Sequence, residues 1–454
     1  MRPELDLAPD RSGKTPFAQR AAAAYFGTLA VLFALLLAAC ALPGGPVRAS
    51  VCRSVETLRQ EGLYPAFFGF KLFQMDNYTD TLMLFEAVAA DETDPLTAMM
   101  VSTAYNVDNF ETLHEDLGRY LETDLATGAQ QADAPALTPF SYARYWHGYL
   151  IWLRPLLALG VPYAGVRVFQ YLVLGVLLAA VLWLLQRRCG RRAAVWFLLS
   201  QLAVAVFFVP HQVQFFTTFA IAYAACIWVL LRPRDTASLC AGLVAVGTAT
   251  AFCDLLVTPI LTLGLPMACW LLMPRQHLRA CPRQCAAVAA GSLCWGGGYG
   301  LCWASKWILA TLLTGQDVIG DAVRQAGVRT SADTWRGMEL TWGNIFRFLF
   351  DTLNSRGLFW PLLFLLVLAL GAFVLCLRSK AALLRALPLG LTALMAPVWF
   401  CVLRTHSIQH GWFTWRALAP TLFAGMAFVY YTCSLKMGLR RLRACLTRKG
   451  GTGQ

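Results

Sequence analysis

The chain has 454 residues, of which 58% are apolar and only 14% are charged. A soluble domain carries about 25% charged residues, so this composition excludes an ordinary soluble protein and places the chain in the membrane class. Apolar segments recur from Ala21 to Leu435 with only two long polar interruptions. We therefore expect one continuous membrane domain over residues 1–454.

About ten apolar stretches approach the roughly 20 residues that a spanning helix needs. They begin near Ala21, Ala164, Ala193, Val213, Ala237, Val257, Ala286, Leu358, Leu384 and Ala417. Taken in chain order, they predict an all-α polytopic membrane protein with about ten transmembrane helices.

The basic residues predict the orientation of these helices. If the N-terminus is cytoplasmic, the loops at 187–192, 232–235, 275–283 and 378–385 are cytoplasmic too, and each is basic, as is the tail at 436–454. This pattern satisfies the positive-inside rule and places both termini inside. The net charge of +13 then reflects orientation and contact with anionic lipids, and no nucleic-acid partner is expected.

The fifteen cysteines predict no disulfide framework, because most lie in apolar stretches where a free thiol packs as a small apolar group. Cys281 and Cys285 flank a short basic segment, but two thiols without further ligands seldom make a zinc site.

Residues 37–40 look like a lipoprotein cleavage box. We expect an uncleaved first helix instead, because a polytopic chain follows.

Two segments on the predicted outer side, 44–163 and 314–357, are too long to be simple connectors. The first contains amphipathic stretches at 64–73, 81–89 and 145–159. These are too short or too interrupted to span a bilayer, so we expect interfacial helices that hold this extracytoplasmic region against the membrane.

Ionisable residues at membrane depth are costly and usually functional. Asp254 lies at the outer end of the predicted fifth helix, His211 closes the third near the outside, and Lys306 lies inside the seventh. The alternative for Lys306 is a lysine that extends its ammonium to the interface.

The short outer loop before the last helix is rich in cations and aromatic residues. His406 and His410 are spaced i,i+4, which puts them on one helical face, and Arg404 and Arg416 bracket them. Arginine forks match phosphate oxygens, so we expect an anion site here. The alternative is an interfacial aromatic belt without a ligand.

The first outer segment holds two further candidate clusters. Asp76 and Asp80 form a carboxylate pair at i,i+4 between apolar residues, which suits a general base or a metal ligand; the alternative for Asp80 is a helix N-cap. Further along, Arg144, His147 and Arg154 stand among aromatic residues, a composition suited to a sugar or a phosphate headgroup.

With its cytoplasmic N-terminus, long acidic first outer segment and polytopic remainder, the chain resembles GT-C glycosyltransferases. That superfamily transfers sugars from polyprenyl-phosphate carriers at the outer face of the membrane. Asp76 and Asp80 stand where the family's loop acid would be, although the family often has adjacent acids there. The segments YARYWHG and HSIQHGWFTWR are similar to ones in bacterial membrane proteins of this kind.

The resemblance implies an inverting sugar transfer in cell-envelope polysaccharide or glycolipid assembly, in the bacterial cytoplasmic membrane. Asp76 or Asp80 would deprotonate the acceptor hydroxyl. The departing phosphate of the polyprenyl-phosphate-linked sugar would be neutralised by cations on the outer side, namely Lys306, Arg404, Arg416 and the histidines His406 and His410. The cofactor stays open, with a divalent metal ion as one option, and so does the oligomeric state.

Two other classes of function are open. A transporter or flippase for a lipid-linked or anionic solute would place charged, broken helices near the bilayer midplane and show internal repeats, and we find no repeat. A non-catalytic membrane subunit of an envelope-assembly complex would leave the outer acids and cations free to vary. Convergence of these residues around one cavity would favour the enzyme.

Overall fold

The computed structural model describes residues 16–69, 73–106, 110–122, 137–232, 235–277, 280–330, 334–335, 338–339, 341, 343 and 359–449. Its regular structure is almost entirely helical, which confirms the all-α prediction. Two short antiparallel pairs are the strands of the described part: β1 (Thr103–Asn106) with β2 (Thr138–Ser141), and β3 (Thr334–Trp335) with β4 (Met338–Glu339).

Five helical segments of the described chain are long and apolar enough to cross a membrane. They are α1 (Phe17–Cys40), α7 (Tyr163–Cys189), α9 (Val213–Leu231), α10 (Thr236–Cys253), and α17 (Lys380–Ala393) with α18 (Met395–Val402). They support a membrane protein.

The other five predicted spans are helical but do not meet the same length and composition in the described residues. They are α8 (Arg191–Ala203), α11 (Leu261–Leu272), α13 (Cys281–Thr314), α16 (Phe359–Cys376) and α21 (Ala419–Thr432). Ten crossings therefore stay a prediction.

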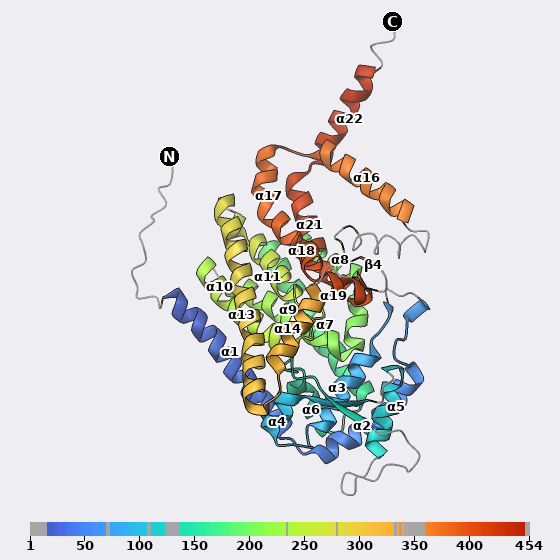
Figure 1. Ribbon diagram of the computed structural model, residues 1–454. Helices are drawn as coiled ribbons and strands as arrows, with labels where there is room; N and C mark the ends of the chain where they lie inside the picture. The colour runs from blue at the N-terminus through green and yellow to red at the C-terminus, as the bar shows by residue number, and fades with distance from the viewer. Residues whose placement is uncertain are drawn as a thin grey trace.

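Helices α1, α10 and α13 run side by side along one flank of the bundle (Figure 1). Glycine permits the closest of these contacts. A Cβ atom on Gly298 of α13 would overlap the carbonyl oxygen of Val244 in α10, and one on Gly247 of α10 would overlap that of Trp295 in α13. The two backbones thus approach through paired glycines, as in many membrane helix pairs.

The glycine contact can be tested with neighbouring variants of one helix. We expect Gly298→Leu to destabilise the purified protein by roughly 1–3 kcal/mol or more, because the added side chain must push α10 and α13 apart. Gly297→Leu is the matched control, since no atom lies within 4 Å of a Cβ at that position. Thermal unfolding in detergent measures both, and equal melting temperatures would contradict the packing described.

The segment between α1 and α7 is a folded helical layer at the lower end of Figure 1. It contains α2 (Gly44–Glu61), η1 (Phe67–Gly69), α3 (Asn77–Ala89), α4 (Pro95–Val101), η3 (Phe110–Thr112), α5 (Leu113–Glu122) and α6 (Leu150–Ala158). The amphipathic interfacial helix expected at 81–89 is wrong, because every residue from Thr81 to Ala89 is buried within the protein. The expected stretch at 64–73 holds only a short 3-10 turn, and 70–72 lie outside the described residues.

The C-terminal half adds several short elements around the bundle. The segment expected as a second outer loop contains α14 (Val318–Thr330), which packs on α13 and on α19 (Arg404–Gln409); most of 331–357 lies outside the described residues. The remaining elements are η4 (Val206–His211), α12 (Pro274–His277), α20 (Gly411–Thr414), η5 (Trp415–Leu418) and α22 (Leu435–Lys449).

Candidate functional site

Four of the predicted site residues, Asp76, Asp80, Asp254 and Arg416, contact the N-terminal turns of α9 or its N-cap Gln212. Asp80, from α3, accepts hydrogen bonds from the backbone N–H groups of Val213 (2.9 Å) and Gln214 (3.2 Å) and from the Tyr163 hydroxyl. The first turn of a helix leaves such N–H groups unpaired and favours negative charge. Asp80 therefore caps α9 from a different helix, and both of its carboxylate oxygens are engaged.

Asp76, which we expected to be a base or a metal ligand, is the N-cap of α3, the role that the sequence offered as the alternative for Asp80. Its carboxylate accepts hydrogen bonds from the backbone N–H (3.1 Å) and the hydroxyl (2.8 Å) of Thr79. The side chain of Gln212 then joins α3 to α9, accepting from the Asp76 N–H (3.0 Å) and donating to the Asn77 side chain (2.9 Å). Burial raises the pKa of both carboxyls, that of Asp80 to about 7, although hydrogen bonds lower it.

Asp254 faces the same helix one turn further along. It follows the last residue of α10, and its Oδ1 accepts from the Thr218 hydroxyl (2.7 Å) and the Val257 N–H (3.1 Å). Its Oδ2 is buried and has no hydrogen-bond partner in the described part of the chain. The backbone then turns sharply, with Leu256 in the left-handed region (φ 65°).

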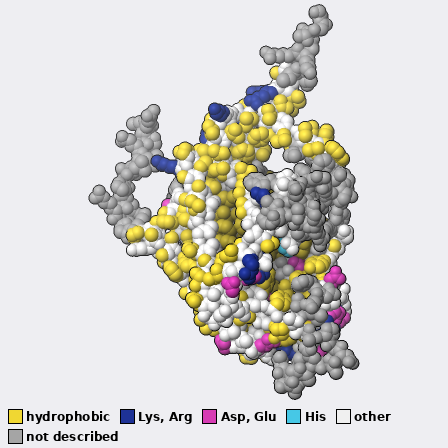
Figure 2. Space-filling model, in the orientation of Figure 1, with side chains coloured by type: hydrophobic (Ala, Val, Ile, Leu, Met, Phe, Trp, Pro, Cys, Tyr) yellow, Lys and Arg dark blue, Asp and Glu magenta, His cyan; other side chains and the backbone are white. Residues whose placement is uncertain are grey.

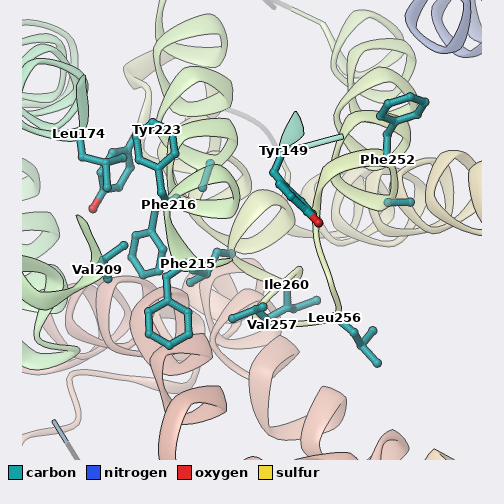
Figure 3. Close-up of a cluster of buried hydrophobic side chains, with 14 of the residues drawn as sticks. Tyr149, Leu174, Val209, Phe215, Phe216, Tyr223, Phe252, Leu256, Val257 and Ile260 are labelled. Carbon is teal, nitrogen blue, oxygen red and sulfur yellow. The ribbon is translucent and has the colours of Figure 1, made fainter. Parts of the chain in front are cut away.

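The segment 404–418 packs against the α10–α11 connection and the first turn of α9. His406 and His410 lie together as their spacing predicts, with ring centroids 4.8 Å apart, and the Nε2 of His406 lies 2.8 Å from the Leu256 carbonyl oxygen. Figure 3 shows Phe215 pointing from α9 toward this C-terminal segment, where it meets Phe413 at 5.8 Å. Burial lowers the pKa of both histidines, that of His410 to about 4, so neither is a cation at neutral pH.

Arg416 has the most unusual environment of the predicted site residues. Its side chain is fully buried between the rings of Phe215 (4.8 Å from the guanidinium carbon) and Trp415 (5.2 Å). None of its guanidinium nitrogens has a hydrogen-bond partner among the described residues. Buried polar groups are nearly always paired, and a buried charge is costly without a counter-ion. An anion placed there would satisfy both requirements.

Lys306 and Arg154, two further expected phosphate ligands, have partners within the fold. Lys306 donates to the carbonyl oxygens of Met99 (2.6 Å) and Met100 (3.0 Å), at the C-terminal end of α4. Arg154 donates to the carbonyl oxygens of Ala87 in α3 (2.8 Å) and Leu42 after α1 (2.9 Å), and to Asp91 (2.9 Å). Cations are favourable at helix C-termini, so the fold itself accounts for both residues.

The remaining predicted residues, Arg144, His147 and Arg404, contact residues other than Arg416. Arg144 pairs with Asp321 of α14 at 2.5 Å, and His147 lies 2.7 Å from the buried carboxylate of Glu86. Arg404 is half-buried, and its Nε donates a hydrogen bond to the carbonyl oxygen of Cys401, three residues earlier in the chain (3.4 Å).

These networks also contain polar residues that were not predicted from the sequence. Arg167 forms a two-pronged ion pair with Glu61 (2.6 and 2.7 Å) and donates to the His211 carbonyl oxygen (3.0 Å). Glu86 is buried beside His147 and the Tyr149 hydroxyl. An arginine and a glutamate within apolar helical stretches were the available signals, because such residues are rarely buried unless paired.

A cavity of about 170 Å³ lies beside α14. Its lining includes Leu256, which follows Asp254 by two residues. Tyr145, Trp303 and Trp307 supply its aromatic walls, and Arg144 and Arg329 lie at its edge. Figure 2 shows basic and acidic side chains together at mid-height on this face of the molecule. For a metal ion, in contrast, the described residues offer no group of three or more His, Cys, Asp or Glu side chains.

No protein-family model, no curated protein and no solved structure matches this chain.

The role of Arg154 in the fold can be tested by removing its charge. We expect Arg154→Met to destabilise the protein by roughly 3–5 kcal/mol, because Asp91 and two helix-terminal carbonyls lose a buried partner. The exposed Arg385→Met is the control. Thermal unfolding measures both. An unchanged melting temperature in Arg154→Met would contradict the structural role, and Arg154 would again be a candidate for binding phosphate.

Proposed function

We propose that the protein is a membrane glycosyltransferase of the GT-C kind, which transfers a sugar from a polyprenyl-phosphate-linked donor to an acceptor outside the cytoplasm. The observation that carries this proposal is the buried, unpartnered guanidinium of Arg416. Its guanidinium lies over the ring of Phe215 in the first turn of α9, the helix whose N-terminal turns also hydrogen-bond Asp80 of α3 and Asp254 of the α10–α11 connection. A buried cation without a counter-ion among the described residues suits a reaction in which a phosphate departs.

Arg416 would act on the leaving group. As the bond between the sugar and the phosphate breaks, negative charge grows on the phosphate oxygen, and a preorganised guanidinium stabilises it without further rearrangement. His406 and His410, which stay neutral, would donate or accept hydrogen bonds but supply no charge. This differs from the expected cationic role of the two histidines.

The topology proposed with this function has ten crossings, with both termini in the cytoplasm of a bacterium. Its support is the distribution of charge. Most acidic side chains of the face in Figure 2 lie in its lower half, where some basic ones lie beside them, whereas the charged side chains at the upper end near α22 are basic. The basic helix α22 would lie at the inner surface, where anionic lipids attract Lys and Arg.

Native cysteines test the orientation. We expect a membrane-impermeant maleimide to label Cys52, an exposed residue of α2, in intact cells. Cys281 and Cys285, at the predicted inner end of α13, are the internal controls and should react only after the membrane is permeabilised. Mass spectrometry of the peptides gives the labelled fraction. Labelling of Cys281 from outside would overturn the orientation.

The anion site has a distinctive signature in stability and binding. We expect Arg416→Met to be more stable than the wild type by roughly 1–4 kcal/mol without ligand, because an apolar side chain replaces a buried unpaired charge. The same variant should lose the thermal stabilisation that polyprenyl phosphate gives the wild type, and at least tenfold in sugar transfer from polyprenyl-phosphate-linked hexoses. Arg385→Met serves as the control. If Arg416→Met binds and transfers normally, the proposal fails.

A transporter is the second candidate, favoured by the buried carboxylate of Asp254 in the connection between α10 and α11. Buried carboxylates at membrane depth are typical of ion and substrate pathways. Proteoliposomes separate the two functions, because a transporter moves the lipid-linked substrate across the bilayer without consuming it.

A further inference from the structure

The three buried acids near the N-terminus of α9 differ in how much of each carboxylate is free. Asp80 uses both oxygens, one on the Gln214 N–H and the other on the Val213 N–H and the Tyr163 hydroxyl. Asp76 also uses both, on the N–H and the hydroxyl of Thr79. Each of these two carboxylates therefore has both oxygens engaged by the fold and offers a substrate proton no oxygen that is wholly free.

Asp254 is the exception. Both of its bonds, from Thr218 and Val257, fall on Oδ1, and Oδ2 is buried without a partner in the described residues. The hydroxyls of Tyr299 in α13 and Thr258 are likewise buried and unpartnered. Oδ1 is thus held in place from two directions while Oδ2 stays available, which is the arrangement that a general base requires.

The surroundings of Asp254 suit the approach of a substrate. Leu256, two residues further on, lines the cavity beside α14 together with Tyr145 and Trp303. The ring of Tyr299 packs against that of Trp303, with centroids 5.1 Å apart, and Tyr299 is close enough to Asp254 for the carboxylate to act on it electrostatically. Figure 3 shows Leu256 and Val257 on the connection between α10 and α11, facing the C-terminal helices.

We propose that Asp254, and neither Asp76 nor Asp80, is the general base of the transfer, a step that rests on the proposed function. Oδ2 of Asp254 takes the proton of the acceptor hydroxyl. The acceptor oxygen bonds to the anomeric carbon, the bond from that carbon to the phosphate oxygen breaks, and the electron pair leaves with the phosphate. Arg416 neutralises that phosphate, and Asp254 later releases its proton to solvent.

The pH dependence follows from the groups around Asp254. These are Cys253 beside it in the chain, Tyr299 of α13, and His406 of α19, which lies against Leu256; Arg329 of α14 acts on Tyr299 and His406. Burial raises the pKa of Asp254 to about 6, although the bonds from Thr218 and Val257 lower it. A base must be ionised, so the transfer rate is expected to fall as the pH drops through about 6.

The experiment compares Asp254→Asn with Asp76→Asn, both assayed for transfer from polyprenyl-phosphate-linked hexoses and for thermal stabilisation by polyprenyl phosphate. We expect Asp254→Asn to lose about 100-fold or more in transfer, the usual contribution of a general base, while its stabilisation by polyprenyl phosphate is unchanged. Asp76→Asn should keep more than a tenth of the wild-type rate. Asp254→Asn with a rate above a tenth of wild type overturns the proposal.

A chemical label keeps the outcome independent of the transfer assay. Dicyclohexylcarbodiimide reacts with protonated carboxyls in apolar surroundings, so we expect it to modify Asp254 increasingly below about pH 6 and to abolish transfer with the same pH dependence. If Asp254 does not incorporate the label while transfer is lost, the assignment is overturned. If Asp254 is modified but the wild type transfers no sugar, the proposed function fails and the base with it, whereas transfer that survives full modification refutes the base alone.

Discussion

The hydrogen bonds between the Asp80 carboxylate and the N-terminus of α9 are the interaction that joins the layer built from α2 to α6 to the helical bundle. The carboxylate accepts hydrogen bonds from N–H groups that would otherwise be unpaired, in a helix at the centre of the bundle. It does so from α3, whose residues are mostly buried. In an apolar interior such unpaired groups are costly, so the two helices have to meet at this point. Gln212 and Asn77 then complete the junction.

The same rule explains most of the other buried charges. Lys306 and Arg154 are placed where helices end and carbonyl oxygens lack partners, and Asp76 is placed where α3 begins. Arg416 stands apart from them, because none of its guanidinium nitrogens has a partner in the described fold, and one oxygen of Asp254 is unsatisfied as well. Both residues contact the first turns of α9.

The sequence predicts the helices well, because apolar runs and their basic flanks depend only on local composition. The pairing of His406 with His410 is equally local, and the spacing of one helical turn predicts it. The roles of Asp76 and Asp80 are not local. Which of them caps which helix depends on Val213, more than a hundred positions away in the chain.

The partners of the buried cations could not be predicted from the sequence either. Lys306 and Arg154 have the composition of phosphate ligands, and nothing near them in the sequence reveals the carbonyl oxygens that they meet in the fold. Arg416 has the same composition and no such partner among the described residues. A charged residue in an apolar helix thus predicts that something pairs with it, while the tertiary fold alone decides whether that partner is the protein or a ligand.

The cap on α9 also has a consequence for the order of assembly. The bond from the Val213 N–H to Asp80 joins residues 133 positions apart, so the first turn of α9 stays incomplete until the layer built from α2 to α6 is in place. Contacts of such long sequence separation form late and slowly. The layer from α2 to α6 is therefore needed to complete the bundle, and a chain that forms its long helices but misfolds this layer would retain a loosely ordered core.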